Sequence, residues 1–171
     1  MPLAIRLLSE VSDSHLQDLA AVLIDCVAGG ASVSFMHPLS PQKALAFWRG
    51  AAEGVARGER ALLVAEDAQG IVGTVQLILA QPENQPHRAD VSKMLVHRRA
   101  RRKGLGAALM RAAEAEARQC GKTLLMLDTT SGMDAERLYA RLGWQRFGEV
   151  PGHALLPQGG LANTAFFYRV L

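Results

Sequence analysis

The 171-residue sequence has no internal repeat, no low-complexity tract and no long segment rich in proline, glycine and serine. Such features mark repeat architectures and domain boundaries. Their absence excludes a solenoid and leaves no boundary between two domains. We therefore expect residues 1–171 to form one domain, which is long enough to bury a substantial hydrophobic core.

No segment reaches the roughly 20 consecutive apolar residues that a membrane-spanning helix needs. The N-terminal residues Met1 to Arg6 also lack the basic region, apolar run and small-residue cleavage site of a secretory signal. We therefore expect a soluble protein of the cytoplasm, with no membrane partner.

The sequence has only two cysteines, Cys26 and Cys120. Both lie in segments with helical periodicity and are far apart, which favours buried free thiols over a disulfide or a zinc site. The five histidines show no metal-ligand spacing either. The sequence predicts no metal site.

Positive charge is modest overall, with a net charge of +3, but it is concentrated in one segment. Arg98 to Lys103 contains five cations, followed by Gly104 and Gly106 and then by an amphipathic pattern over 105–119. Cations are unfavourable at a helix N-terminus, which already carries partial positive charge. Glycines let backbone N–H groups approach an anion closely. The segment therefore predicts a site for a phosphate or pyrophosphate, and not a general nucleic-acid surface.

Hydrophobic periodicity and turn residues predict an alternating arrangement of elements. Helices are expected from the Ser12 to Ser14 cap to Val27, from Ser40-Pro41 to Gly58, over 105–119, and from a capping box at Ser131 to Asp134 through Leu142. Strands are expected over 3–8, 61–66, 71–80, 89–96, 123–129, 144–150 and 165–171. The strand, helix and strand from 89 to 129 imply a parallel pair. Hairpins elsewhere make this a mixed sheet of the α/β class.

The segment Arg101-Arg102-Lys103-Gly104-Leu105-Gly106 resembles the Arg/Gln-x-x-Gly-x-Gly/Ala signature of the GCN5-related N-acetyltransferases, the GNAT family. Equivalent flanking segments are Met94 to His97, Ala107 to Met110 and Leu138 to Trp144. This resemblance implies a mostly antiparallel, twisted central sheet with one splayed parallel pair, flanked by about four helices. It also implies acetyl-CoA as the acetyl donor.

Within that family, the chain resembles the tabtoxin-resistance acetyltransferases, which acetylate a β-lactam toxin. The matching segments are Gly29 to Phe35, Arg88 to Val91, Leu127 to Thr129 and Gly148 to Gly152. This resemblance implies a homodimer that acetylates the amine of a small, amino-acid-like molecule and confers toxin or antibiotic resistance.

The resemblance also assigns residues to the cofactor. Backbone groups of Met94, Leu95 and Val96 are expected to pair with the pantetheine amides. The pyrophosphate is expected at the N–H groups from 101 to 107, comprising Arg101, Arg102, Lys103, Gly104, Leu105, Gly106 and Ala107, with Arg101 and Lys103 adding charge. Ser131 is a further candidate for contact with the cofactor, at a position where many family members have an Asn that makes this contact. Arg98 and Arg99 lie outside the signature, and the sequence leaves open whether they reach another phosphate or only water.

Acetyl transfer to an amine needs a proton acceptor for the amine and a donor for the leaving thiolate. Strand alternation places Asp90 on one face with Ser92, Met94 and Val96, and Asp128 on one face with Leu124 and Met126. Two carboxylates from neighbouring strands could therefore converge on one amine, and the shorter Asp90, where the related enzyme has Glu, favours a bridging water.

The family pattern makes Tyr139 the candidate proton donor to the coenzyme A sulfur. Ser34 and Phe35, in an apolar loop after Gly29-Gly30, are the candidate acceptor contacts together with Asp90 and Asp128.

Two alternatives remain at this point. The chain could acetylate a protein N-terminus or a lysine side chain, which an open groove would favour over a closed pocket. It could instead be a non-catalytic module that uses its arginines to bind a nucleotide or nucleic acid, with salt-dependent affinity.

Overall fold

The computed structural model describes residues 3–171, and Met1 and Pro2 lie outside the described part. Its elements follow the predicted order. The helices are α1 (Asp13–Ala28), α2 (Pro41–Ala56), α3 (Leu105–Gln119) and α4 (Asp134–Arg141), with a 3-10 turn, η1 (Arg98–Ala100). The strands are β1 (Ala4–Leu7), β2 (Arg60–Asp67), β3 (Gly70–Ile78), β4 (Arg88–Val96), β5 (Leu124–Thr130), β6 (Gln145–Leu155) and β7 (Leu161–Val170).

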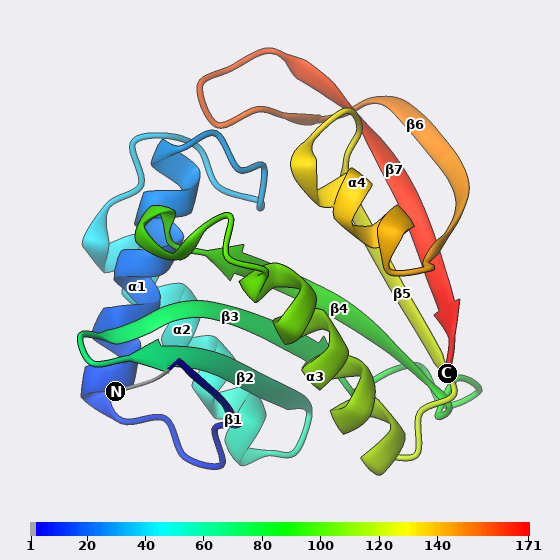
Figure 1. The fold of residues 1–171 in the computed structure, drawn as a ribbon, viewed down its shortest axis with the longest axis horizontal. Helices are drawn as coiled ribbons and strands as arrows, with labels where there is room; N and C mark the ends of the chain where they lie inside the picture. Colours follow the sequence, from blue (N-terminus) through cyan, green and yellow to red (C-terminus); the bar gives the residue numbers. More distant parts are fainter. Residues whose placement is uncertain (1–2) are drawn as a thin grey trace.

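The strands form a seven-stranded sheet in the order β1-β2-β3-β4-β5-β7-β6. The β4–β5 pair is parallel and the other neighbours are antiparallel. This confirms the mixed sheet with one parallel pair that the sequence predicted. In Figure 1, β4 and β5 lie together near the C-terminus and diverge toward the other end of the molecule.

Helices cover both faces of the sheet (Figure 1). Each face has its own hydrophobic core. The core under α3 contains Leu109 and Met110 with sheet residues such as Val75, Leu125 and Phe167. The second core joins α1 and α2 to the other face. The core to which a strand residue belongs therefore shows on which face of the sheet its side chain lies.

A buried carboxylate ties α3 to the C-terminal part of the chain. Glu114, on α3, accepts a hydrogen bond from Trp144 Nε1 at 3.1 Å, and its other oxygen lies 3.3 Å from Arg169 Nε. A charge buried this deeply is tolerated because it is paired and hydrogen-bonded.

The caps of α1 and α2 match the sequence pattern, but that of α4 does not. Ser12 and Ser40 accept from the N–H groups of His15 and Lys43. The expected capping box at Ser131 is wrong, because α4 begins after Met133 and has no side-chain cap. The side chain of Glu136 instead accepts from the Gly132 N–H at 2.6 Å, so the turn before α4 is held from within the helix.

The last hairpin is longer than predicted. β6 runs to Leu155 and β7 begins at Leu161, whereas the sequence placed a loop from 151 to 164. Pro151 and Gly152 lie inside β6 at a register shift between Val150 and Ala154. Proline and glycine are tolerated there because β6 is an edge strand and the shift relaxes the ladder.

The two cysteines are free, as predicted, but only Cys26 is buried, and Cys120 is exposed. No helix between residues 3 and 171 combines the length and apolarity needed to cross a bilayer.

Candidate active site

The candidate site lies where β4 and β5 separate. The two strands pair at only three positions, Arg88 with Leu124, Ala89 with Leu125 and Asp90 with Met126, although β4 continues to Val96 and β5 to Thr130. Beyond these positions, the facing edges have no ladder partner across the gap. A cavity of about 980 Å³ opens there, bounded by both strand ends, the N-terminus of α3, α4 and the segment after α1.

A β-bulge in β4 changes which residues face this cavity. Ser92 pairs with Gln76 and Leu95 with Thr74, so Lys93 and Met94 together oppose Val75. The extra residue reverses the alternation. The predicted common face of Asp90, Ser92, Met94 and Val96 is therefore wrong: Met94 and Val96 pack with the α3 core, on the side of Ala89 and Val91.

The N-terminus of α3 presents backbone donors to the large cavity. Gly104 is the N-cap, with a φ of 75°, and no side chain caps the helix. The N–H groups of Leu105, Gly106 and Ala107 consequently lack an intrahelical partner and are available to an anion. A Cβ on Gly106 would lie 3.1 Å from Leu138 Cδ2, so glycine lets the helix pass close to α4.

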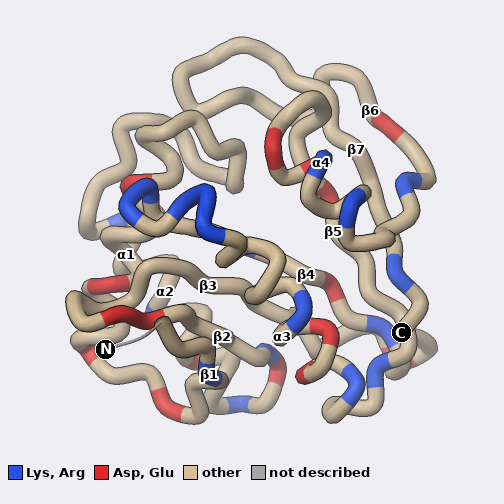
Figure 2. Tube along the Cα trace, viewed as in Figure 1, with Lys and Arg blue, Asp and Glu red and all other residues tan. Residues whose placement is uncertain are grey.

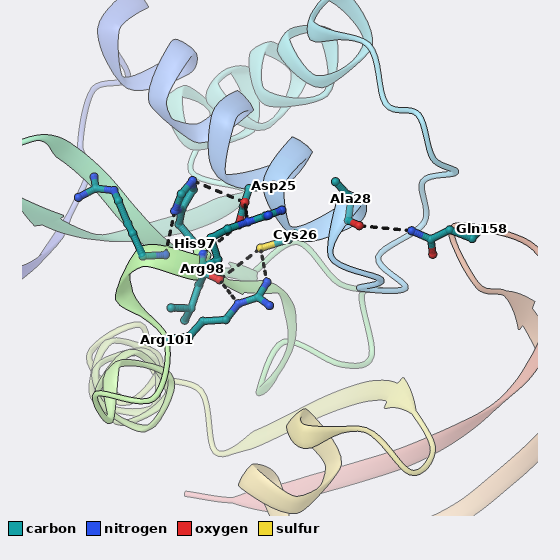
Figure 3. A network of polar contacts seen from close by, with 9 residues as sticks. Asp25, Cys26, Ala28, His97, Arg98, Arg101 and Gln158 are labelled. Atoms are coloured by element: carbon teal, nitrogen blue, oxygen red, sulfur yellow. Dashed lines mark hydrogen bonds and ion pairs between the residues drawn. The ribbon is translucent and has the colours of Figure 1, made fainter.

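The basic segment, Arg98 to Lys103, lies at the N-terminal end of α3 (Figure 2). Some of its cations reach the cavity and others do not. Arg101 and Arg102 line the cavity. Arg101 is oriented by its Nε, which donates to the Val96 carbonyl at 2.9 Å, and by its Nη2, which lies 3.6 Å from Cys26 Sγ (Figure 3). Lys103 is outside the lining, with its Nζ donating to the Arg99 carbonyl at 3.4 Å.

Arg98 and Arg99 point elsewhere, which answers the question that the sequence left open. Arg98 forms an ion pair with Asp25 of α1 (Figure 3), and Arg99 forms one with Asp67 of β2. These contacts fix the basic segment to the fold, so the two charges are neutralised within the protein.

These features fit acetyl-CoA. Unpaired N–H groups at the α3 N-terminus suit its pyrophosphate, and the unpaired strand edges suit its amides. The cofactor candidates that line the cavity are Met94, Leu95, Val96, Arg101, Arg102, Gly104, Leu105, Gly106, Ala107 and Tyr139. Ser131 does not line it, and its backbone N–H instead donates to the Asn163 carbonyl at 2.9 Å.

Tyr139 comes from α4 and lines the large cavity. Its side chain is 6% exposed and packs against Trp144 and Phe167, with ring centroids 6.2 and 6.1 Å apart. Burial, followed by the charge of Asp128, raises the pKa of the Tyr139 hydroxyl far above its ordinary value. Tyr139 therefore keeps its proton throughout the neutral range, as a proton donor must.

A second cavity, of about 270 Å³, adjoins the first at the end of β5. Five residues line both cavities: Ser32, Ser34, Asp128, Thr129 and Thr130. Phe35 and Met36 close the small cavity on one side, and His153, Ala154 and Leu155 on another. Asp128 is therefore placed at the junction of a large site and a small one.

Asp90 lies outside both linings. Its carboxylate pairs with Arg88 and accepts from Gln81 Nε2 at 3.1 Å. The sheet does bring Asp90 and Asp128 to one face, because Leu125 and Leu127 occupy the opposite side of β5. The two carboxylates nevertheless have different surroundings, and only Asp128 reaches the cavities.

The segment after α1 is anchored across the gap. Ser32 Oγ donates to the Leu155 carbonyl at 3.2 Å, the His37 N–H donates to Pro157 at 2.8 Å, and Gln158 Nε2 donates to Ala28 at 3.3 Å (Figure 3). These bonds join this segment to the end of β6 and to the β6–β7 turn, and two of the bonded residues, Ser32 and Leu155, line the small cavity.

Lys93 is the main cavity residue that sequence reasoning missed. The sequence shows a lysine between Ser92 and Met94 in this strand, but the bulge that orients it was not visible in the residue pattern. Within residues 3–171, no three His, Cys, Asp or Glu side chains gather as a metal site would require.

Comparisons with known proteins agree with this geometry. The sequence pattern of the acetyltransferase (GNAT) family matches residues 31–144, more than half of the chain. Many solved structures share the fold, among them three acetyltransferases or candidate acetyltransferases. A ribosomal-protein-alanine N-acetyltransferase from Brucella melitensis is 22% identical, with a TM-score of 0.82 over 98% of this chain and 99% of that one.

A candidate acetyltransferase from Salmonella typhimurium, solved with its cofactor acetyl-CoA, is 20% identical, with a TM-score of 0.80 over 100% and 95% of the two chains. A candidate phosphinothricin N-acetyltransferase is 23% identical, with a TM-score of 0.76 over 99% and 98%. The splayed strands and the uncapped helix agree with these matches. The chain belongs to the GNAT family and is an acetyl-CoA-dependent N-acetyltransferase.

Proposed function

We propose that this enzyme transfers the acetyl group of acetyl-CoA to the amine of a small molecule, by direct attack while both substrates are bound. The observation that carries the proposal is the pair of adjoining cavities with Asp128 in their shared wall. The large cavity has the donors that a pyrophosphate needs, and the small one leaves a separate place for the acceptor. The shared wall puts the acceptor next to the cofactor.

In this proposal, Asp128 and Tyr139 handle the protons. Bound acetyl-CoA supplies a thioester whose carbonyl carbon is open to attack. Asp128 accepts the proton that the acceptor ammonium releases, directly or through one water, so that the free amine can form the C–N bond. Tyr139 donates its proton to the sulfur as the C–S bond breaks, and the second proton that the nitrogen loses on becoming an amide returns to Tyr139 through solvent. In the same proposal, Asp90 orients Arg88 and does not touch the amine.

The small cavity favours a small acceptor over a protein. Its volume of about 270 Å³ lies near the lower end of ligand sites. Three hydrogen bonds join the Ala28 to His37 segment to the end of β6 and the β6–β7 turn, which limits the room for a polypeptide there. Acetylation of a protein N-terminus or lysine would require an open groove there.

We further propose an amino-acid-like toxin or antibiotic as the acceptor class. Support comes from the resemblance to the tabtoxin-resistance enzymes and from the fold shared with a candidate phosphinothricin N-acetyltransferase. We also propose a cytoplasmic location, as expected from the sequence.

We propose a homodimer that forms through the face of β6 and β7 that carries Phe147, Phe166 and Tyr168. Phe147 is 53% exposed and lies beside Phe166 and Tyr168, with ring centroids 6.2 and 5.9 Å away. Leu155 and Leu161 are also exposed on this hairpin. An exposed patch of this kind marks an interaction surface.

Incubation with acetyl-CoA and a panel of amines tests the enzymatic proposal, with release of free coenzyme A as the readout. The panel contains amino acids, β-lactam amino-acid toxins, polyamines and N-terminal peptides. We expect turnover with small amino-acid-like acceptors and little with peptides. A preference for peptides would overturn the assignment to small molecules.

A further inference from the structure

Lys93 has a backbone conformation that lysine rarely adopts. It lies in the β4 bulge with a φ of 51°, in the left-handed region. Conformations of this kind cost free energy and persist where the surrounding structure imposes them, often at functional sites. The bulge re-aims the side chain, and Nζ lies over the Phe47 ring of α2, 5.4 Å from its centroid. Lys93 thus turns toward the face covered by α2, whereas Met94 packs with the α3 core.

This position brings the ammonium group toward the acceptor end of the site. Phe47 meets Phe35 edge to face, with centroids 5.4 Å apart, and Phe35 lines the small cavity. Lys93 lines the large cavity together with Asp128, one of the five residues that line both cavities. The Lys93 cation therefore shares the large cavity with the carboxylate that also reaches the small one.

The Lys93 cation forms no ion pair with a carboxylate of residues 3–171. No carboxylate oxygen of residues 3–171 lies within 4 Å of its Nζ. Burial lowers the pKa of Lys93, the carboxylate of Asp128 opposes that effect, and Arg60 of β2 adds to it. An unpaired, partly buried cation is costly unless a counter-ion completes the site.

We propose that Lys93 binds the carboxylate of the acceptor while Asp128 receives its amine, so that the enzyme selects zwitterionic molecules of the amino-acid class. This inference rests on the proposed function and narrows it. Phe35 supplies an apolar wall of the small cavity, and Phe47 packs edge to face against it. Lys93 acts in specificity, and proton transfer stays with Asp128 and Tyr139.

The test compares acceptors that differ only in that carboxylate. Steady-state rates are measured for a set of L-amino acids and for their carboxamides, with the wild type, Lys93→Met, Lys93→Arg and the control Lys43→Met, which removes an exposed cation from α2. We expect the wild type to favour the acids. Lys93→Met should raise the KM for the acids about 10-fold to 100-fold, the range of one charged hydrogen bond. It should leave the KM for the amides and the KM for acetyl-CoA unchanged.

Lys93→Arg should keep much of the preference, because it keeps the charge, and Lys43→Met should behave as the wild type. Equal rates with acids and amides in the wild type would overturn the inference while leaving the acetyltransferase proposal intact. A Lys93→Met variant with an equally lowered kcat for the acids and the amides would also overturn the inference. That result would show that Lys93 acts in the chemistry or in the fold.

Binding measurements separate the two proposals. Calorimetry titrates the same acids and amides into the enzyme saturated with coenzyme A. Binding of acids that Lys93→Met abolishes would support the inference even if no amine were turned over, a result that would count against the proposed function alone. Equal affinity for acids and amides would refute the role of Lys93 whatever the turnover.

Discussion

Replacing Tyr139 by phenylalanine removes one hydroxyl group from the wall of the large cavity and leaves the ring in place. The ring packs between Trp144 and Phe167, and phenylalanine keeps both contacts. No hydrogen bond joins the hydroxyl to any residue from 3 to 171, so the change leaves no protein donor or acceptor unpaired. Tyr139→Phe should therefore alter the free energy of unfolding by less than about 0.5 kcal/mol.

Its effect on catalysis should be much larger. General acid catalysis contributes about 10²-fold to 10⁴-fold to a rate, and each tenfold corresponds to about 1.4 kcal/mol of activation free energy. A neighbouring water can replace part of the donor, so we expect the lower end, a loss of about 100-fold in kcat, or ~2.7 kcal/mol. The KM for acetyl-CoA should change less than about threefold, because the N–H groups of α3 provide most of the binding.

The assay follows free coenzyme A with a thiol reagent, and thermal unfolding is recorded in parallel. The raised pKa of Tyr139 also predicts that kcat of the wild type shows no fall from loss of this proton between neutral pH and pH of about 9. An unchanged kcat in Tyr139→Phe would refute the acid role. A fall in kcat that is matched by a lower unfolding temperature would show a structural role instead.

Asp128→Asn keeps the shape of the junction but removes the proton acceptor, so kcat should fall about 100-fold at neutral pH while calorimetry finds acetyl-CoA affinity unchanged; weakened cofactor binding would contradict this. Gly106→Val places branched carbons against Leu138 and should weaken acetyl-CoA binding about tenfold or more in the same titration. Glu114→Ala leaves the Trp144 N–H and Arg169 without their partner and should cost about 2–4 kcal/mol in denaturant unfolding. Phe147→Glu charges the exposed face of β6 and should shift the protein to monomers in sedimentation, whereas an unchanged mass would move the dimer interface elsewhere.

Much of the fold was predictable because its signals are local. Ser12 and Ser40 indicate where α1 and α2 begin, and the glycine and basic residues before Leu105 indicate the start of α3. The β4–α3–β5 unit followed from the order of these signals. Ser131 failed as a cap because the helix begins later, after Met133, and the side chain of Glu136 holds the turn at Gly132 instead. The sequence pattern does not show which of two polar side chains will capture a turn.

The site was less predictable, because its decisive contacts are distant in the sequence. Arg98 is neutralised by Asp25, 73 residues away, and Arg99 by Asp67, 32 residues away. The bulge at Lys93 is set by pairing with β3, and it reversed the side-chain alternation that assigned Met94 to the face of Asp90. Simple alternation still held for β5, which has no bulge, and it placed Asp128 correctly relative to Leu127.

The most direct test of the account is the initial-rate pattern when acetyl-CoA and an accepted amino acid are varied together. Adjoining cavities that hold both substrates at once predict double-reciprocal lines that intersect, and no acetylated protein when acetyl-CoA is added alone. Parallel lines, together with an acetyl-enzyme detected by mass spectrometry, would contradict direct transfer at the Asp128 junction.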